Sequence, residues 1–579
     1  KSKYEEIVNN LGINWNITTG LLWKTQFSLT RKITDTKRFL DPLSSKNTTP
    51  QTAENPSSGE LNTSRGNEFY WDLSSTLSYN RSVEKHHINL LLGVNARSAK
   101  TDNISASYRG FPSGALSSPN YAEEIVSKPV SSDNSTRLIG FLGTLNYSYN
   151  DVYLLDASVR MDGSSEFGAD KRFAPFWSAG TGVNIHNYGF MKGQTVIDQL
   201  KIRVSYGQTG KVNFPPYVAR TTYKMFTDGW YKTGFGGTLY ALGNTNLTWE
   251  TTNTWDAGVE LSLWKRLLYI KASYYQKKTV DLVNSVTIPS STGFTTYMDN
   301  IGEVENKGYE LEFRSEVVRR KDLFVAVFAN LAHNENRILK ISESLKAYND
   351  RVKDHFANSN RFDGSNTQPF TQYVEGGSQT SIWGVPSLGI DPATGEEIFI
   401  RPDGSITNTW NTNDQVVLGD TEPKIQGTFG LNATYKNLSL YMTFMYEAGG
   451  QIYNSTLRDK VEDVNVYTSN VDKRVFSERW QEPGDKARYR KLTSGVGGSI
   501  MRTRPTSRFV EDNNVLTLNS ISLGYDFDAG QKWMKTIGLS MLRFEIGAND
   551  VCRWSSVKVE RGLNYPYARS FNFSLKAAF

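Results

Sequence analysis

The sequence predicts an all-β protein, an antiparallel transmembrane β-barrel of about seventeen strands with short turns at one end and long loops at the other. Three observations predict it. Apolar and polar residues alternate along one segment after another, aromatic residues and glycine are abundant, and the mean hydropathy is nevertheless low, at −0.48. In a membrane barrel only alternate residues of each strand face lipid, so the membrane-facing surface is apolar while the average residue is not.

Composition narrows the class of protein. The 579 residues include 30 Tyr, 29 Phe, 13 Trp and 47 Gly, and they far exceed one soluble core. No apolar run reaches about 18 residues, so no transmembrane helix is expected. The single cysteine, Cys552, excludes a disulfide within the chain and a cysteine-based metal site. The net charge of +6 is small for this length and gives no indication of a nucleic-acid partner.

The last ten residues, S-F-N-F-S-L-K-A-A-F, show the alternation most plainly. The apolar face carries Phe571, Phe573, Leu575 and Phe579, and the other face is polar, small or charged. We expect this segment to be the closing strand of the barrel, with those four residues facing lipid. A soluble strand could show the same pattern, so the prediction depends on its recurrence.

The pattern recurs along the chain, within segments 11–17, 71–79, 88–94, 141–161, 200–206, 255–263, 309–313, 429–446 and 542–546. On the polar face of these strands we expect Arg160, Arg203, Glu310 and Glu312 to line a water-filled lumen. Charged side chains at every second position would be costly inside a soluble sandwich but need no partner in water.

The connections alternate as well. Tight turns are predicted near 19, 83, 150, 265, 320 and 436, and longer turns with a short helix near 187–198 and 528–536. The long segments are 38–67, 99–136, 209–250, 279–303, 336–422 and 450–513. Outer-membrane barrels have this layout, with short periplasmic turns and long extracellular loops, whereas compact soluble domains rarely carry so many long loops.

The strand count predicts a barrel that continues beyond this sequence. A first strand at about 5–18 and the last strand would run in the same direction, but a closed antiparallel barrel needs an even number of strands. About five more strands would give 22, the number in plugged outer-membrane transporters. No signal-peptide pattern opens the chain. We therefore expect residues 1–579 to be the C-terminal part of a larger protein, with the plug and the first strands outside it.

Residues that could carry catalysis or hold a metal show no convincing pattern. His86 and His87 lie beside a tight turn, and the sequence 207–211 lacks the spacing of a phosphate-binding loop. The acidic loops 391–397 and 401–404 lack the ligand spacing of an EF-hand, and turn chemistry explains them better. We predict neither an enzyme nor a cofactor or metal site.

The long loops are rich in aromatic residues, which suit sugar rings or peptides. The candidates for contact with a substrate or a covering partner are Trp230, Tyr231, Phe370, Tyr373, Trp383, Trp410 and Tyr453. The alternative is that these side chains pack the loops against one another and against a partner.

Several segments carry a family resemblance. They are V-R-M-D-G-S-S-E-F-G at 159–168, L-K-I-R-V-S-Y-G-Q-T-G at 200–210, G-N-T-N-L-T-W-E-T-T at 243–252, P-S-S-T-G-F at 289–294 with N-I-G-E-V-E-N-K-G-Y-E-L at 300–311, G-I-D-P-A-T-G at 389–395, L-G-D-T-E-P-K at 418–424 and Y-P-Y-A-R-S-F-N-F at 565–573. From about residue 70 onward the chain resembles the SusC/RagA class of TonB-dependent outer-membrane transporters of Bacteroidota. It departs from the family mildly, with Ala568-Arg569 before the last strand.

The resemblance implies a 22-stranded barrel with an N-terminal plug, energised by the TonB complex through a segment on the plug side. It also implies a SusD-like surface lipoprotein as a lid, a dimer of such pairs in many cases, outer-membrane lipid around the barrel, and glycans or peptides as substrates. The main hypothesis is active import of a bulky nutrient across the outer membrane. The second is a non-transporting scaffold that anchors a surface lipoprotein or an enzyme assembly; a passive porin is disfavoured by the strand count and the loop lengths.

Overall fold

The computed structural model describes the chain except for residues 45, 47–57, 169–170, 213, 215, 233, 288–295, 301, 342, 359–366, 467–469, 493–500, 529 and 559–568. The chain divides into two compact units. The first unit comprises residues 1–181, 207–251 and 283–300, and the second comprises 182–206, 252–282 and 301–579.

One antiparallel sheet dominates the described residues and contains 18 strands. One of them, β5 (Glu124–Ile125), is only two residues long, which leaves the seventeen long strands that the sequence predicts. Strands that follow one another in the chain pair as antiparallel neighbours. No helix among the described residues is both long enough and apolar enough to cross a membrane.

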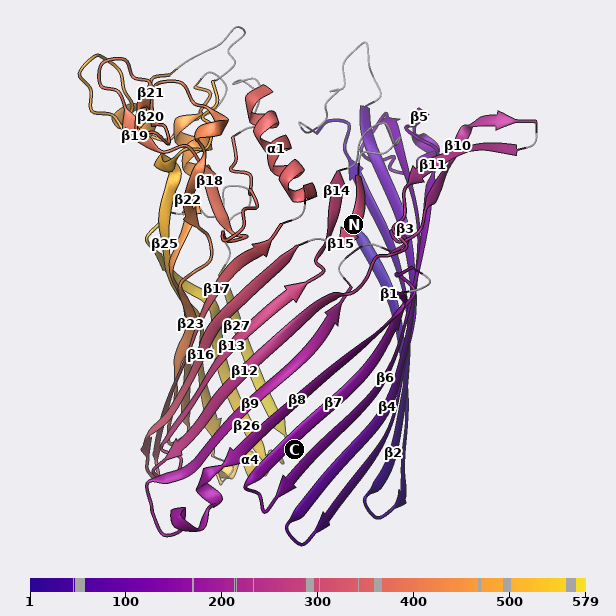
Figure 1. Cartoon of the computed structure of the whole chain (residues 1–579), viewed down its shortest axis with the longest axis vertical. Coiled ribbons are helices and arrows are strands. Elements are labelled where there is room, and N and C mark those ends of the chain that lie inside the picture. The colour runs from indigo at the N-terminus through magenta and orange to yellow at the C-terminus, as the bar shows by residue number, and fades with distance from the viewer. Residues whose placement is uncertain are drawn as a thin grey trace. The chain divides into compact units, whose positions relative to one another are not determined.

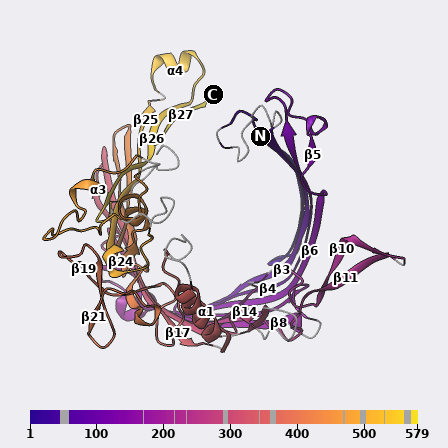
Figure 2. The same ribbon diagram turned by 90° about the horizontal axis from the view of Figure 1, so that it is seen from above.

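The first unit contains the indigo and purple strands of Figure 1. They are β1 (Ser2–Thr18), β2 (Leu21–Leu40), β3 (Ser58–Val83), β4 (His86–Phe111), β6 (Val130–Tyr149), β7 (Tyr153–Ser164) and most of β8 (Phe173–Asn184). Two separate hairpins belong to the same unit, β10 (Thr222–Tyr231) with β11 (Gly234–Ala241), and β14 (Val283–Thr287) with β15 (Thr296–Asn300). The β10–β11 hairpin projects away from the long strands of its unit (Figure 2).

The second unit contains the remaining long strands. They are most of β9 (Ile197–Lys211) and β12 (Glu250–Leu263), then β13 (Leu268–Val280), β16 (Glu303–Arg319), β17 (Leu323–Lys340), β23 (Ile425–Tyr435), β24 (Leu438–Tyr453), β25 (Val510–Phe527), β26 (Met541–Ser555) and β27 (Ser570–Ala578). From β16 to β27 each of these strands pairs with the next long strand.

The predicted tight turns are confirmed, and several need left-handed backbone. Gly20 has φ +81°, and a Cβ there would meet the carbonyl oxygen of Asn80 at 2.2 Å, so only glycine fits. Asn150 adopts φ 53° in the three-residue turn between β6 and β7, and Lys436 adopts φ 51° in the two-residue turn between β23 and β24. The two longer connections contain the expected short helices, η3 (Ile185–Asn187), η4 (Gly189–Met191) and α4 (Lys532–Thr536).

The strand registers confirm the alternation of faces. In β26 and β27, Phe573 lies opposite Ile546 and Leu575 opposite Phe544, so the aromatic face of the last strand continues across its neighbour. Phe573 is 71% exposed and Leu575 68% exposed. Large apolar side chains left uncovered along whole strands are typical of a lipid-facing surface and rare on soluble proteins.

The strands are longer and the loops shorter than predicted. The irregular segment expected at 38–67 shrinks because β2 continues to Leu40 and β3 begins at Ser58, and β4 and β6 likewise extend into the segment 99–136. The outer parts of these strands carry polar residues on both faces, since both faces lie beyond the lipid. Alternation therefore fades although the strands continue.

The long segments of the second unit also contain regular structure that the sequence did not predict. The segment 336–422 holds helix α1 (Glu343–Asn358) and five short strands: β18 (Ser381–Gly384), β19 (Ser387–Ile390), β20 (Glu397–Ile400), β21 (Ile406–Thr407) and β22 (Val416–Asp420). The segment 450–513 holds α2 (Ser455–Leu457), the π-helix η8 (Arg458–Glu462), α3 (Arg474–Ser477) and η10 (Ser507–Phe509). We call residues 343–422 and 454–509 the loop assembly.

Candidate functional site

The four residues predicted to line the lumen all lie on the polar face of their strands. In the first unit, Arg160 donates from Nε to both carboxylate oxygens of Asp162, at 2.7 and 2.6 Å. In the second unit, Arg203 pairs with Asp256 on β12. Charges of both signs therefore pair on this face, so its net field is weak.

Glu310 and Glu312 lie on the polar face of β16. The register places Glu312 opposite Lys271 and Glu310 opposite Ser273 on β13. Their apolar neighbour Leu311 points to the opposite face. Their role as lumen-lining residues stays a prediction, but their placement agrees with it.

The loop assembly is held together by two hydrophobic cores. In the first, α1 presents Tyr348, Val352 and Phe356 at a spacing of four residues, so they share one face of the helix. This face packs on Val385, Phe399 and Trp410. The second core gathers Leu457, Val461, Val464, Val475, Tyr489 and Phe509.

A buried network of ion pairs joins the two parts of the loop assembly. We call Glu397, Glu462, Asp463, Arg479, Arg490 and Arg508 the ion network. Arg508 donates from Nε and Nη2 to the two oxygens of Glu397, both at 2.8 Å, and from Nη2 to Glu462 at 2.9 Å. Glu397 lies on β20 and Arg508 on η10, so this contact links segments more than 100 residues apart.

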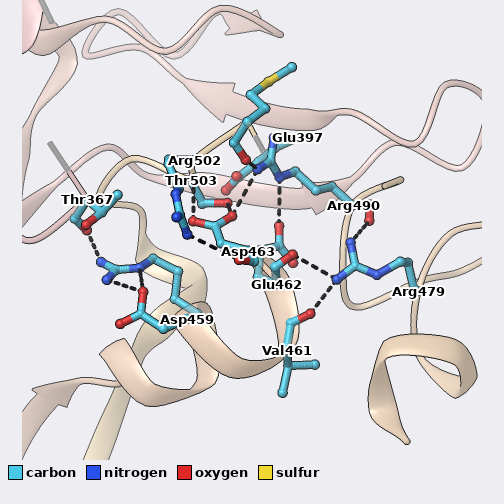
Figure 3. Close-up of polar contacts among 12 residues, drawn as sticks. Thr367, Glu397, Asp459, Val461, Glu462, Asp463, Arg479, Arg490, Arg502 and Thr503 are labelled. Atoms are coloured by element: carbon cyan, nitrogen blue, oxygen red, sulfur yellow. Dashed lines mark hydrogen bonds and ion pairs between the residues drawn. The ribbon is translucent and has the colours of Figure 1, made fainter. Parts of the chain in front are cut away.

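The rest of the ion network surrounds the pair Glu462 and Asp463 (Figure 3). Arg490 lies 3.3 Å from Glu462 and 3.0 Å from Asp463. Asp463 also accepts hydrogen bonds from the backbone N–H and the hydroxyl of Thr503, at 2.8 and 2.7 Å. Arg479 donates to backbone carbonyls, including that of Glu462 at 2.8 Å. Three carboxylates thus balance three guanidinium groups in a buried setting.

The contact between Glu397 and Arg508 favours the charged form of both groups. Burial alone would raise the pKa of the Glu397 carboxyl, but the Arg508 guanidinium and its hydrogen bonds hold that pKa below its ordinary value. Burial opposes the charge of Arg508, yet Glu397 and Glu462 keep the pKa of Arg508 well above its ordinary value. Both groups therefore stay charged at neutral pH.

We expect the loop assembly to resist mild acid. Because the pKa of Glu397 is lowered on folding, its stabilising effect is fully present above the ordinary value of 4.5 and is lost only as pH falls below it. Hydrogen exchange of residues 397–400 and 507–509, corrected for intrinsic rates, should show constant protection from pH 7 to 5 and a loss below about 4.5. A loss of protection between pH 7 and 5 would contradict this assignment.

The acidic turn at 391–395 is a docking element of the loop assembly. Asp391 accepts a hydrogen bond from the backbone N–H of Ala393 at 3.0 Å and another from the Thr394 hydroxyl at 2.7 Å, as in an Asx turn. The Trp480 indole N–H donates to the Pro392 carbonyl at 2.9 Å. Turn chemistry, rather than ligands arranged around a metal, therefore accounts for this sequence.

Gly395 makes the close approach to Trp480 possible. Its φ is +69°, and a Cβ there would lie 2.5 Å from the indole ring. Gly395→Ala should therefore destabilise the docked turn by more than the roughly 1 kcal/mol of backbone strain alone. Gly404→Ala is the matched control, since Gly404 has φ +83° with nothing within 4 Å. Limited proteolysis around 391–395 should accelerate clearly more for the first variant than for the second; equal acceleration would contradict the packing role.

The predicted loop aromatics have different surroundings. Phe370, Trp410 and Tyr453 pack against the two cores, and Trp410, only 9% exposed, donates its indole N–H to the Pro505 carbonyl at 3.1 Å. For these three residues the packing alternative accounts for the observed positions. Tyr373 is half-buried with its ring 5.7 Å from that of Tyr348. Trp383 is half-buried on β18 opposite Val417 of β22.

Two of the predicted aromatics belong to the first unit. Tyr231 lies at the end of β10 and is 69% exposed, whereas the side chain of Trp230 lies outside the described part of the chain. The seven aromatics therefore belong to two different units of the chain. Contact with a substrate or partner stays a prediction, and it is best supported by exposure for Tyr231.

The ion network was missed by sequence reasoning. Its six residues come from four separate segments, and no spacing between them repeats. The one available signal is the density of arginine at 474–508 within a loop that also holds Glu462-Asp463. Neighbouring opposite charges in a long loop do not reveal that the loop buries them.

The family of β-barrels described as "TonB dependent receptor-like, beta-barrel" matches residues 1–454. The chain belongs to this family. The predicted SusC/RagA resemblance is thereby confirmed at the level of family, together with an outer-membrane location. The polar and apolar faces of this TonB-dependent receptor barrel are those that such a location requires.

Individual relatives agree with the assignment. The barrel is 29% identical over 500 residues to TonB-dependent receptor P26 of Formosa agariphila, which covers 84% of this chain and 49% of the relative. It is 27% identical over 406 residues to TonB-dependent receptor SusC of Bacteroides thetaiotaomicron, covering 67% of this chain and 38% of the relative. The chain spans about half the length of the curated relatives P26 and P3 of Formosa agariphila.

Solved structures share the fold. The RagAB peptide transporter superposes with a TM-score of 0.81 at 22% identity, covering 96% of this chain and 59% of the other. The RagAB peptide importer in its 'open-open' state gives a TM-score of 0.82 at 23% identity, covering 100% and 61%. At this identity the comparison establishes the fold of the receptor barrel and not its substrate.

Proposed function

We propose that this receptor barrel imports a bulky nutrient, a peptide or an oligosaccharide, across the outer membrane in a TonB-dependent manner. The observation that carries the proposal is a folded loop assembly beyond the long-loop ends of β17, β24 and β25, in a chain whose strands have one apolar and one charged face. A passive channel needs no folded structure of this size, whereas a receptor needs a shaped surface that captures its ligand before transport.

The partners belong to the same proposal. A SusD-like lipoprotein would cover the loops as a lid, and the TonB complex would act on a plug. We also propose that residues 1–579 are the C-terminal part of the receptor, with the plug and the first strands outside this sequence. This agrees with the share of the relatives that the chain covers. The name of the RagAB transporter supports a peptide, and the similarity to SusC supports the SusC class without selecting the substrate.

A scaffold without transport is the second candidate. It is favoured by the packing of Phe370, Trp410 and Tyr453 inside the loop cores, because a rigid platform for a partner protein requires such packing. The two candidate functions predict different bound molecules in the protein purified from its native membrane.

Purification of the full-length protein from native outer membranes tests the proposal. An importer should co-purify with a surface lipoprotein and with peptides or oligosaccharides detectable by mass spectrometry. Deletion of its gene should also abolish growth on that nutrient. A bound lipoprotein with no small ligand and no growth defect would favour the scaffold and contradict import.

A further inference from the structure

The lipid face of the first unit ends in a row of positive charges. On β2 this face runs through Trp23, Phe27 and Leu29, which lie opposite Leu77, Leu73 and Trp71 of β3. From Leu21 to Arg31 the strand rises about 33 Å, and at the usual barrel tilt this corresponds to about 25 Å across the membrane. Arg31 therefore stands where the apolar band ends, on the side of the long loops.

Two further cations share this level. The register places Arg31 opposite Phe69, and Phe69 opposite Lys100 of β4. Arg137 of β6 lies opposite Ser98, one row nearer the apolar band. All three cationic side chains are exposed. We call Arg31, Lys100 and Arg137 the boundary row; the strands that carry them, β2, β4 and β6, belong to one sheet, in which β3 lies between β2 and β4.

The boundary row is incompletely neutralised. Lys100 Nζ lies 3.5 Å from Asp102, and Arg31 Nε lies 3.5 Å from the amide oxygen of Asn67. Among the contacts of the described residues, neither Arg31 nor Arg137 has a carboxylate within ion-pair distance. The carboxylates of this face, Glu5, Asp102 and Asp133, stand one row farther from the lipid.

A groove continues outward from the boundary row. It has a volume of about 490 Å³, and its lining includes Lys3, Lys37, Arg65, Ile104 and Tyr108. The carboxylate of Asp35 also lines it, 3.8 Å from Arg65. Cations together with an aromatic ring and an aliphatic side chain suit a sugar that carries acidic groups. The groove therefore extends the boundary row into a surface large enough for a head group.

The second unit provides an internal comparison. At the corresponding level of its lipid face, beyond Tyr309 and His333, Lys307 of β16 pairs with Glu335 of β17 at 3.2 Å. One row farther, Arg337 lies opposite Glu305. Each cation there has an opposite charge as its cross-strand neighbour, so this boundary is neutral. An unbalanced row is thus not a general property of the strands where they leave the lipid.

We propose that Arg31, Lys100 and Arg137 bind the phosphoryl groups of a phosphorylated glycolipid in the outer leaflet. Arginine forms two parallel hydrogen bonds to phosphate, and Phe69 and Trp71 beside the row offer apolar contact to the acyl end of the lipid. The boundary row is continuous with the lipid face, and the proposal depends on the outer-membrane location. It is independent of the transported substrate and of the lid.

The test compares two double variants of the full-length protein purified from native membranes. R31Q/R137Q removes two cations from the boundary row, and K307Q/R337Q removes two from the neutral boundary of the second unit. Near a charged membrane surface each cation contributes about fivefold in affinity, so R31Q/R137Q should retain roughly 25-fold less phosphorylated glycolipid, as measured by mass spectrometry. The control pair should retain the wild-type amount, and equal retention by both variants would overturn the proposal.

Rebinding distinguishes the source of the phosphate. Delipidated wild-type protein should gain thermal stability from the phosphorylated glycolipid and much less from its dephosphorylated form, from phosphatidylglycerol vesicles or from inorganic phosphate. Equal stabilisation by any of these three would overturn the assignment. If R31Q/R137Q fails to fold, R31K/R137K replaces it. This variant keeps the charge but loses the paired hydrogen bonds of arginine, so it should retain clearly less glycolipid than the wild type, and wild-type retention would contradict the contact of these arginines with phosphate.

Discussion

Arg508→Met is expected to unfold the loop assembly locally while the long strands stay intact. The substitution leaves the buried carboxylate of Glu397 without its ion-pair partner and removes one of the arginines that pair with Glu462. Breaking a buried pair in this way costs about 3–5 kcal/mol. Hydrogen exchange should show a loss of protection at 397–400 and 507–509, and limited proteolysis should cut within 343–422. The strands should remain protected, because their stability comes from the sheet and the membrane.

Arg488→Met is the matched control for this prediction. Arg488 pairs with Glu511 at 3.2 Å, but its side chain is 55% exposed, and an exposed pair contributes about 1 kcal/mol or less. A second arm, Arg508→Met with Glu397→Gln, removes a buried charge of each sign and should restore part of the protection. The buried ion network would lose its structural role if Arg508→Met and Arg488→Met had the same small effect.

The second large effect is expected for Phe573→Arg in the last strand. Phe573 lies on the lipid face opposite Ile546, six residues before the end of the last strand's apolar face at Phe579. An arginine at that depth should destabilise the protein in a bilayer by about 2–4 kcal/mol. Urea titration of the protein folded into lipid vesicles should show this as a lower midpoint.

Asn572→Arg tests whether the face rather than the strand matters. Asn572 is the neighbouring residue, lies on the polar face opposite Gly547 and is exposed. A charge there should stay in water and change stability by less than about 0.5 kcal/mol. Equal destabilisation by the two variants would show that the faces of β27 are wrongly assigned.

The membrane part of the fold could be predicted from the sequence because lipid imposes a period of two. Alternation predicted that Phe573, Ile546 and Leu311 lie on the apolar faces of their strands, and the register agrees, since Phe573 lies opposite Ile546 and Leu311 opposite Leu331. The turns at Asn150 and Lys436 could be predicted because polar residues interrupt two alternating runs. Strand lengths could not be predicted. For example, β3 begins as early as Ser58, and its first residues meet water on both faces, so they show no alternation.

The loop assembly could not be predicted because long-range contacts decide it. Glu397 and Arg508 are neighbours in space but belong to loops separated by the two strands β23 and β24, and they lie more than 100 residues apart in the chain. Trp410 illustrates the same limit: an aromatic side chain in a polar loop suggested ligand contact, yet it packs beneath α1 and donates to Pro505. Local sequence shows that a residue is aromatic or charged, whereas its burial depends on which side chains of a distant segment pack against it.

Active import is the central claim, and accumulation of substrate in whole cells tests it most directly. Cells with the full-length protein, cells lacking its gene and cells treated with a protonophore would be supplied with labelled peptide and oligosaccharide pools. We predict accumulation beyond the outer membrane of one pool only, in energised cells that carry the gene. Accumulation that persists without the gene or without an energised inner membrane would contradict the proposed function.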